Sequence, residues 1–328
     1  METTHKTTPT ELLRFFNIRQ EDKKYTPKSI DDYMEYVKSN FGKEINATKV
    51  SSICKKLENE GLLFDIGKKG RLPFFNQLYM NLQFDERIAI YGGYDFLYYG
   101  FSAIRDAFKN SILPINVQKS NKDLDIGTCI IQEKNLILTA KHCVDGMKNI
   151  EIRHNGNIIK ANKFFMPKND KYDFAWIETE DDLNVKTLMW DNGNILDDVL
   201  TLGYPPISGF DSLQFAETGT ISSVIKASAG EIVAEGESYL DRGDYFLINA
   251  RVKGGNSGGP VINKYGYCVG MLTQIPFDNV DPNRIDIMGF GVAIQTKFIH
   301  KVMSNQDNVI EYEAENSPNG FKIGKIVD

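Results

Sequence analysis

Residues 254–260, Gly-Gly-Asn-Ser-Gly-Gly-Pro, constrain this chain more than any other stretch. An apolar run over 245–250 precedes them and Val261 and Ile262 follow, which predicts a strand entering a tight glycine turn and a strand leaving it. Glycines around Ser257 allow backbone conformations that a Cβ forbids. Such a turn can direct two backbone N–H groups at one point, where they stabilise a developing oxyanion. Ser257 is therefore a candidate nucleophile, and the N–H groups of Gly255 and Ser257 are candidate oxyanion-hole donors.

A glycine-rich hairpin with an incidental serine would explain the same residues, because glycine and serine are common in turns. A serine hydroxyl is a weak nucleophile unless a base accepts its proton and a third group orients that base. His142 lies three residues after the expected strand 136–139, and Asp173 directly precedes the apolar run 174–177. The order is His142, Asp173, Ser257, with spacings of 31 and 84 residues, which is ample for three separate loops.

The sequence from residue 112 onward has a pattern typical of an all-β protein. Short apolar runs alternate with turn residues, which predicts a sandwich or barrel. The expected strands are 112–117, 127–132, 136–139, 149–153, 174–178, 199–203, 219–224, 231–235, 246–251, 269–274 and 290–294. The periodic stretch 295–303 predicts a closing helix.

Four motifs in this order resemble the trypsin/chymotrypsin-type serine proteases, and in particular their HtrA-like and glutamyl-endopeptidase-like branch. They are Leu-Thr-Ala-Lys-His over 138–142, Asp-Phe-Ala over 173–175, Gly-Asn-Ser-Gly-Gly-Pro over 255–260 and Gly-Phe-Gly-Val-Ala-Ile over 289–294. The resemblance implies a mainly β double barrel and a serine endopeptidase acting on protein or peptide substrates without a cofactor or metal. His142 would be the general base, Asp173 would orient it, Ser257 would attack, and Gly255 and Ser257 would bind the oxyanion.

This chain differs from the family pattern at two positions that bear on regulation and on substrate specificity. Zymogen-activated members carry an aspartate before the nucleophile, whereas this chain has Asn256, so activation by N-terminal clipping is not expected. Trypsin-like enzymes carry an acid six positions before the serine, where this chain has Arg251. Arg251 would favour an acidic substrate side chain, unless it points elsewhere and the pocket is apolar. The other pocket walls are predicted at Leu272, Thr273, Gln274 and Gly291.

The first 80 residues predict a small α+β domain. Helices are expected over 10–20, 29–38 and 46–60, followed by a strand over 62–66, a turn over 67–70 and a returning strand over 71–75. This order resembles a winged helix-turn-helix domain, which implies a DNA or protein contact. The candidate contact residues are Thr48, Lys49, Ser52 and Lys56 on the third helix and Lys68, Lys69 and Arg71 on the wing. Residues 1–80 hold 14 Lys and Arg against 11 Asp and Glu, a weak excess for phosphate binding, so a protein contact is favoured.

The length of 328 residues predicts more than one domain. We expect a winged-helix domain over 1–80, an aromatic-rich connector over 81–110 with a helix near its end, a trypsin-like domain over 111–305 and a C-terminal tail over 306–328. The net charge of −6 disfavours non-specific nucleic-acid binding by the whole surface. The chain lacks the apolar core of a signal peptide and any apolar run long enough for a membrane span. The cysteines, Cys54, Cys129, Cys143 and Cys268, lack metal spacing, so we expect reduced thiols in the cytoplasm, with a Cys129–Cys143 disulfide as the alternative.

The preferred hypothesis is thus a cytoplasmic serine endopeptidase carrying a winged-helix module that recruits it to a partner. This architecture resembles effector proteases of prokaryotic conflict and antiviral defence systems. Two alternatives remain at this point: a DNA-binding regulator whose protease part cleaves itself or a partner, and a pseudoprotease scaffold. The presence of His142, Asp173 and Ser257 together argues against the scaffold.

Overall fold

A computed structural model describes residues 7–18, 26–69, 76–207, 223–238, 242–273 and 290–327. The chain divides into two compact units, residues 1–103 and 104–328. In the part of the chain that is described, no helix is both long and apolar enough to cross a bilayer.

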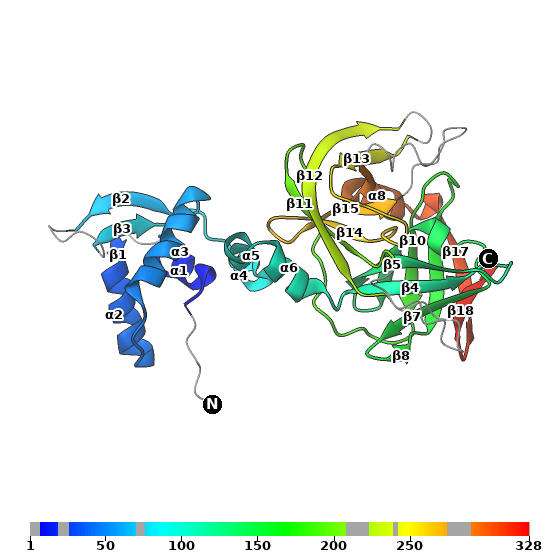
Figure 1. Cartoon of the computed structure of the whole chain (residues 1–328), viewed down its shortest axis with the longest axis horizontal. Coiled ribbons are helices and arrows are strands. Elements are labelled where there is room, and N and C mark those ends of the chain that lie inside the picture. The colour runs from blue at the N-terminus through cyan, green and yellow to red at the C-terminus, as the bar shows by residue number, and fades with distance from the viewer. Residues whose placement is uncertain are drawn as a thin grey trace. The chain divides into compact units, whose positions relative to one another are not determined.

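The first unit combines five helices and a small sheet in its described residues (Figure 1). The helices are α1 (Pro9–Phe15), α2 (Ile30–Phe41), α3 (Ala47–Asn59), α4 (Glu86–Tyr91) and α5 (Gly93–Tyr99), and the strands are β1 (Lys28–Ser29), β2 (Phe64–Lys68) and β3 (Gln77–Met80). The strands form a sheet in the order β1-β3-β2. Ser29 begins α2 with a capping box to Asp32, and Asn46 caps α3 by accepting hydrogen bonds from the N–H groups of Thr48 and Lys49.

The structure draws the boundary of this unit later than the sequence predicted. Residues 81–110 were expected to be a connector, but Ala89 and Tyr94 are buried in the same core as α1, α2 and α3. Tyr94 stacks on Phe84 with ring centroids 5.6 Å apart, and Asp95 accepts hydrogen bonds from the backbone N–H and the hydroxyl of Thr10. The aromatic residues of this stretch therefore complete a core that three short helices cannot close alone. The predicted returning strand over 71–75 lies outside the described residues, and β3 follows it.

Helix α6 (Phe101–Phe108) spans the boundary between the two units, and the second unit contains a first β-barrel. Its strands are β4 (Ile112–Gln118), β5 (Leu124–Glu133), β6 (Leu136–Thr139), β7 (Asn149–His154), β8 (Asn157–Ile158), β9 (Ala161–Pro167), β10 (Ala175–Thr179), β17 (Val309–Ser317) and β18 (Gly320–Ile326). They pair in the order β18-β17-β9-β10-β6-β5-β4-β7-β8. An additional pairing of β18 with β7, at Phe321 and Ile150, closes the sheet into a ring.

A second barrel forms from strands later in the chain. It closes in the order β11-β12-β13-β16-β15-β14, which are Asp198–Gly203, Lys226–Glu237, Asp244–Ile248, Gly291–Gln295, Cys268–Thr273 and Pro260–Asn263. Its core is built from fully buried aliphatic residues such as Val199, Val261 and Leu272 together with Phe246. Helix α8 (Thr296–Met303) and a 3₁₀ turn, η2 (Gln306–Asn308), lead from this barrel back to β17.

The expectation of a mainly β protein with two closed barrels is confirmed for the second unit (Figure 1). One part of the prediction differs: residues 306–328 were expected to be a tail, but β17 and β18 form a hairpin within the first barrel. The reason is visible in the packing, because Phe321 is buried against Phe164 with ring centroids 5.9 Å apart. The predicted strand 219–224 falls largely outside the described residues.

Candidate active site

Strand pairing brings His142 and Asp173 to the same end of the first barrel. Strands β6 and β10 are antiparallel with Thr139 opposite Ala175. His142 lies three residues after Thr139, in the 3₁₀ turn η1 (Lys141–Cys143), and Asp173 lies two residues before Ala175. Two loops leaving one edge of a sheet in this register must meet, and the buried strands hold them there.

The two side chains contact each other directly. Asp173 Oδ2 lies 2.7 Å from His142 Nδ1, and Asp173 Oδ1 accepts a hydrogen bond of 2.9 Å from the backbone N–H of His142. With Nδ1 donating to the carboxylate, the opposite nitrogen, Nε2, is left to accept a proton. The arrangement fixes both the tautomer and the orientation of the imidazole.

Thr273 holds the same carboxylate from the second barrel. Its hydroxyl donates a hydrogen bond to Asp173 Oδ2 from the end of β15. The sequence placed Thr273 on a substrate-pocket wall, whereas the structure places its hydroxyl on Asp173. A single hydroxyl at the end of an apolar strand carries no local signal of this contact, so sequence reasoning missed it.

The charge state of His142 depends on competing effects. Partial burial of the imidazole opposes its protonation, but the hydrogen bond to Asp173 and the neighbouring Cys143 side chain favour it more strongly. The pKa of His142 is therefore raised above the ordinary value of 6.5.

Ser257 lies on a turn whose shape needs glycine. The backbone N–H of Asn256 donates to the carbonyl oxygen of Lys253 at 3.0 Å, and Gly255 between them has a φ of +92°. Residues 253–256 therefore form a type II turn, in which only the third residue, Gly255, has a positive φ. Glycine adopts this conformation without strain. A Cβ on Gly255 would also lie 2.8 Å from the Cα of Pro205.

Both barrels fasten this turn. The Thr128 N–H donates to the Ser257 carbonyl at 2.9 Å, and the Thr128 hydroxyl donates to the Gly255 carbonyl at 2.7 Å. The N–H of Gly258 donates to the carbonyl of Leu272 at 2.8 Å. Within the described ranges, the N–H groups of Gly255 and Ser257 donate no hydrogen bond to the protein, so both are available for a ligand oxygen.

His142 and Ser257 line one cavity of about 330 Å³. Its other walls come from the glycine turn, the start of β5 and the loop after η1, with these lining residues: Val117, Lys119, Asp125, Ile126, Gly127, Cys143, Met147, Gly254 and Gly255. Lys119 and Asp125 form an ion pair of 2.9 Å at the wall. Cys143 is a free thiol, as is Cys129, so the disulfide alternative is not what the structure has. The described residues contain no group of acidic, histidine and cysteine side chains arranged to hold a metal ion.

The remaining predicted pocket residues lie elsewhere. Arg251 is exposed, and its backbone N–H donates to the Ser228 hydroxyl at 2.9 Å. Leu272 is fully buried in the barrel core and is not a pocket wall. A Cβ on Gly291 would lie 2.5 Å from a methyl carbon of Val252, so the Val252 side chain packs against Gly291. The acidic preference inferred from Arg251 stays a prediction, and Gln274 lies outside the described residues.

The predicted contact residues of the first unit are only partly available. Thr48, Lys49 and Ser52 are exposed on α3, and Lys68 is exposed on β2. Lys56 instead donates to the backbone carbonyl of Tyr98 and lies 5.0 Å from the centre of its ring. Lys69 lies 3.7 Å from Asp32, and Arg71 is outside the described residues.

Comparison with known proteins agrees with this geometry. Residues 127–271 match the trypsin-like peptidase domain model. The chain carries a trypsin-like peptidase domain. The serine endoprotease DegS of Haemophilus influenzae is 29% identical over 231 residues, covering 62% of this chain and 64% of DegS. The chain thus matches slightly under two thirds of the length of this curated relative.

Solved structures give a weaker likeness to this peptidase domain. A variant of the HtrA-type protease AlgW with a tripeptide is 19% identical, with a TM-score of 0.49 over 64% of this chain and 65% of that one. A serine endoprotease from Yersinia pestis is 22% identical, with a TM-score of 0.48 over 67% and 76% of the two chains.

Proposed function

We propose that the chain is a serine endopeptidase in which Ser257, His142 and Asp173 form a catalytic triad. The observation that carries the proposal is the 2.7 Å contact between Asp173 Oδ2 and His142 Nδ1 in a cavity that His142 shares with Ser257. The peptidase-domain match over 127–271 supports it. The substrate class is protein or peptide, as expected for this domain.

The reaction follows from the roles of the three groups. Ser257 Oγ attacks the scissile carbonyl carbon while His142 Nε2 accepts its proton, and Asp173 stabilises the resulting imidazolium. The N–H groups of Gly255 and Ser257 donate to the oxyanion of the tetrahedral intermediate. His142 then protonates the leaving amine, and a water activated by the same imidazole releases the acyl group from Ser257. Thr273 acts as a positioning residue through Asp173.

A fluorophosphonate probe tests this proposal, together with cleavage profiling on a diverse peptide library. Wild type should label and cleave, Ser257→Ala should do neither, and Ser304→Ala, which alters an exposed serine at the end of α8, should behave as wild type. Equal labelling of Ser257→Ala and wild type would refute the assignment. Labelling without peptide cleavage would refute endopeptidase activity while leaving Ser257 as a nucleophile.

We also propose that the first unit is a winged-helix recognition module. The sheet order β1-β3-β2 with α2 and α3 before β2 supports this, as does the exposed face of α3 that carries Lys49 and Ser52. The engagement of Lys56 by Tyr98 and of Lys69 by Asp32 reduces the charge available to phosphate, which favours a protein partner.

Anisotropy titrations of labelled duplex DNA at two salt concentrations distinguish the partners. A protein-binding module should bind DNA weakly, and Lys49→Ala should change that binding little. Tight, sequence-specific binding that Lys49→Ala weakens would instead support a DNA-binding regulator whose peptidase domain cleaves itself or a partner.

The combination of a recognition unit with a peptidase domain is the basis for a proposed role in prokaryotic antiviral defence. Free thiols at all four cysteines fit the reducing cytoplasm that such a role requires. Phage plating on cells expressing wild type or Ser257→Ala tests it. Protection by wild type alone is the expected result, and equal plating on both would contradict it.

A further inference from the structure

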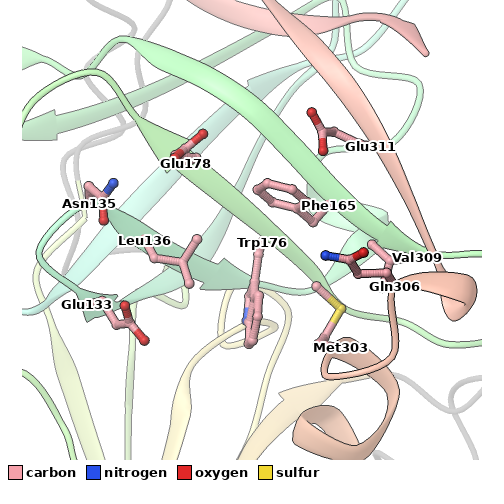
Figure 2. A pocket seen from close by; sticks show the side chains of 10 residues that line it. All are labelled: Glu133, Asn135, Leu136, Phe165, Trp176, Glu178, Met303, Gln306, Val309 and Glu311. Carbon is pink, nitrogen blue, oxygen red and sulfur yellow. The ribbon is translucent and has the colours of Figure 1, made fainter. Parts of the chain in front are cut away.

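The outer face of the first barrel carries a second cavity, of about 550 Å³ (Figure 2). Strands β6, β9, β10 and β17 and the end of α8 contribute its walls. None of its lining residues also lines the cavity that contains His142 and Ser257. The second cavity is therefore a separate feature of the peptidase domain.

Strand register places aromatic rings at the centre of this cavity. Trp176 on β10 is opposite Phe165 on β9, and Phe165 is opposite Glu311 on β17. Side chains of directly opposed residues lie on the same face of a sheet, so these three form one row across three strands. Figure 2 shows the Phe165 ring between Trp176 and Glu311, with Met303 of α8 at the lower edge.

Carboxylates surround the aromatic row. Glu178 lies two residues after Trp176 and so points to the same face, and Glu133 lies at the end of β5 beside Leu136. Glu311 is neutralised by Lys163, with the two charged groups 2.5 Å apart. Among the residues that the structure describes, Glu133 and Glu178 form no ion pair. Lys163 is also directly opposite Glu178 in the strand register and attracts its charge. Glu133, Glu178 and Glu311 thus outnumber this lysine, so the cavity lining keeps an excess of negative charge beside its apolar floor.

An occupant must complement both features. A guanidinium group on a three-carbon stem can pack its stem and its plane on aromatic rings while its N–H groups reach carboxylates. The indole N–H of Trp176 is buried without an acceptor in the described structure. A peptide brings carbonyl oxygens as well as the cationic side chain, whereas a free cation does not.

We propose that this cavity binds an arginine side chain of a peptide segment, with Glu133 and Glu178 receiving the guanidinium and with Trp176 and Phe165 packing against the stem. The site takes a cationic peptide outside the catalytic cleft. It can hold a substrate or a regulatory partner while Ser257 acts elsewhere.

Full-length Ser257→Ala protein tests the proposal, because it cannot cleave the probe through Ser257. The probe is acetyl-Gly-Gly-Arg-Gly-Gly-amide, compared with its citrulline and leucine counterparts, and the readout is tryptophan fluorescence. The chain has two tryptophans, Trp176 and Trp190, whose ring centroids lie 6.4 Å apart. Because Trp176 lines the cavity, binding there should change the tryptophan emission. The arginine peptide should bind at least about fivefold more tightly than either counterpart, and added salt should weaken it. Equal binding of the three peptides, or no fluorescence change, would overturn the proposal.

Variants localise the effect. Glu178→Gln and Glu133→Gln should each weaken the arginine peptide about two- to fivefold, whereas Glu235→Gln, an exposed carboxylate on β12, should not. Trp176→Phe should abolish most of the fluorescence change while circular dichroism confirms the fold. An unchanged affinity in both Glu133→Gln and Glu178→Gln would place the peptide elsewhere. If sedimentation shows a dimer that Glu178→Gln dissociates, the occupant is a second copy of this chain and the proposal fails.

Discussion

At the residue scale, Asp173 is the point where the two barrels act on one imidazole. Its carboxylate accepts hydrogen bonds from the His142 backbone and imidazole on one side and from Thr273 on the other. The side chain is only 14% exposed, so these donors replace most of its water. Three donors on one carboxylate leave it a single orientation.

Asp173→Asn should lower kcat by roughly 10³- to 10⁴-fold, because an amide no longer selects the tautomer that leaves Nε2 free to accept a proton. KM should change much less, since Asp173 does not line the substrate cavity. Steady-state kinetics on a cleaved peptide gives both constants. A drop of less than about tenfold would show that the imidazole is oriented by other groups.

The pH profile should report the raised pKa of His142. The proposed general base works only when deprotonated, so kcat/KM should rise with pH along a limb whose midpoint lies above 6.5. Asp173→Asn should move this limb to lower pH, because the carboxylate that favours the imidazolium is gone. Protonated His142, paired with Asp173, should contribute to the free energy of unfolding. This contribution should be complete below pH 6.5 and lost as pH rises through the pKa of His142 in the folded state. A limb centred at or below pH 6.5 in wild type would contradict this.

At the element scale, an ion pair ties the loop of η1 to the loop that carries Asp173. Lys141 Nζ lies 2.8 Å from Asp170 Oδ1, and the Lys141 side chain is only 10% exposed. Lys141 is the residue directly before His142, and Asp170 lies three residues before Asp173. The ion pair therefore holds the two loops together. It contributes little to the free energy of unfolding, because the Asp170 carboxylate is exposed to solvent.

Lys141→Met keeps the apolar part of the side chain and removes the ion pair with Asp170. We expect kcat to fall about threefold with KM and the melting temperature nearly unchanged, because the imidazole and carboxylate are held less firmly. Lys134→Met, at an exposed lysine in the turn before β6, serves as the control. A large fall in melting temperature with kcat preserved would mean that the ion pair is structural.

The β17–β18 hairpin should be essential to the first barrel. Phe321 is 1% exposed, and Phe321→Ala should reduce the free energy of unfolding by about 3–5 kcal/mol through a cavity beside Phe164. Ile326→Ala, at a residue 57% exposed in the same strand, should cost far less. Urea denaturation measures both, and similar losses would show that the hairpin contributes little.

Sequence reasoning succeeded for elements whose signals are local. The prediction of β6 over 136–139 matched the structure because three apolar residues and a β-branched threonine form a short strand signal. Helix α3 was predicted within one residue at each end from its Asn46 cap and Gly61. The hairpin was missed because β17 alternates glutamates with apolar residues and looks solvated. Its charges are compensated by Lys163 and Lys322, which only the fold brings near.

The same distinction holds for the site. His142, Asp173 and Ser257 lie in motifs whose spacing is readable along the chain, and the structure brings His142 and Asp173 into contact. Leu272 was placed on a pocket wall by its position in the chain, and position alone cannot tell which face of β15 its side chain occupies, so its burial in the barrel core was missed. The contact of Thr273 with Asp173 joins residues 100 positions apart and has no local signature.

At the scale of the whole molecule, the division after Ala103 predicts two units that fold separately. A chain of residues 101–328, which keeps α6 intact, should cleave a short peptide with kcat/KM within about twofold of the full chain. Circular dichroism and peptide kinetics check the truncated and full-length proteins side by side. Loss of folding in the truncated chain would show that the peptidase domain needs the first unit.

The hairpin also sets the timing of assembly during synthesis. Residues 309–326 leave the ribosome after every other strand of the two barrels, yet they close the first barrel between β7 and β9. A nascent chain would already carry His142, Asp173 and Ser257 while the barrel that supports His142 and Asp173 is still an open sheet. The proposed triad would thus be complete only after a hairpin synthesised later than all three of its residues has closed the barrel.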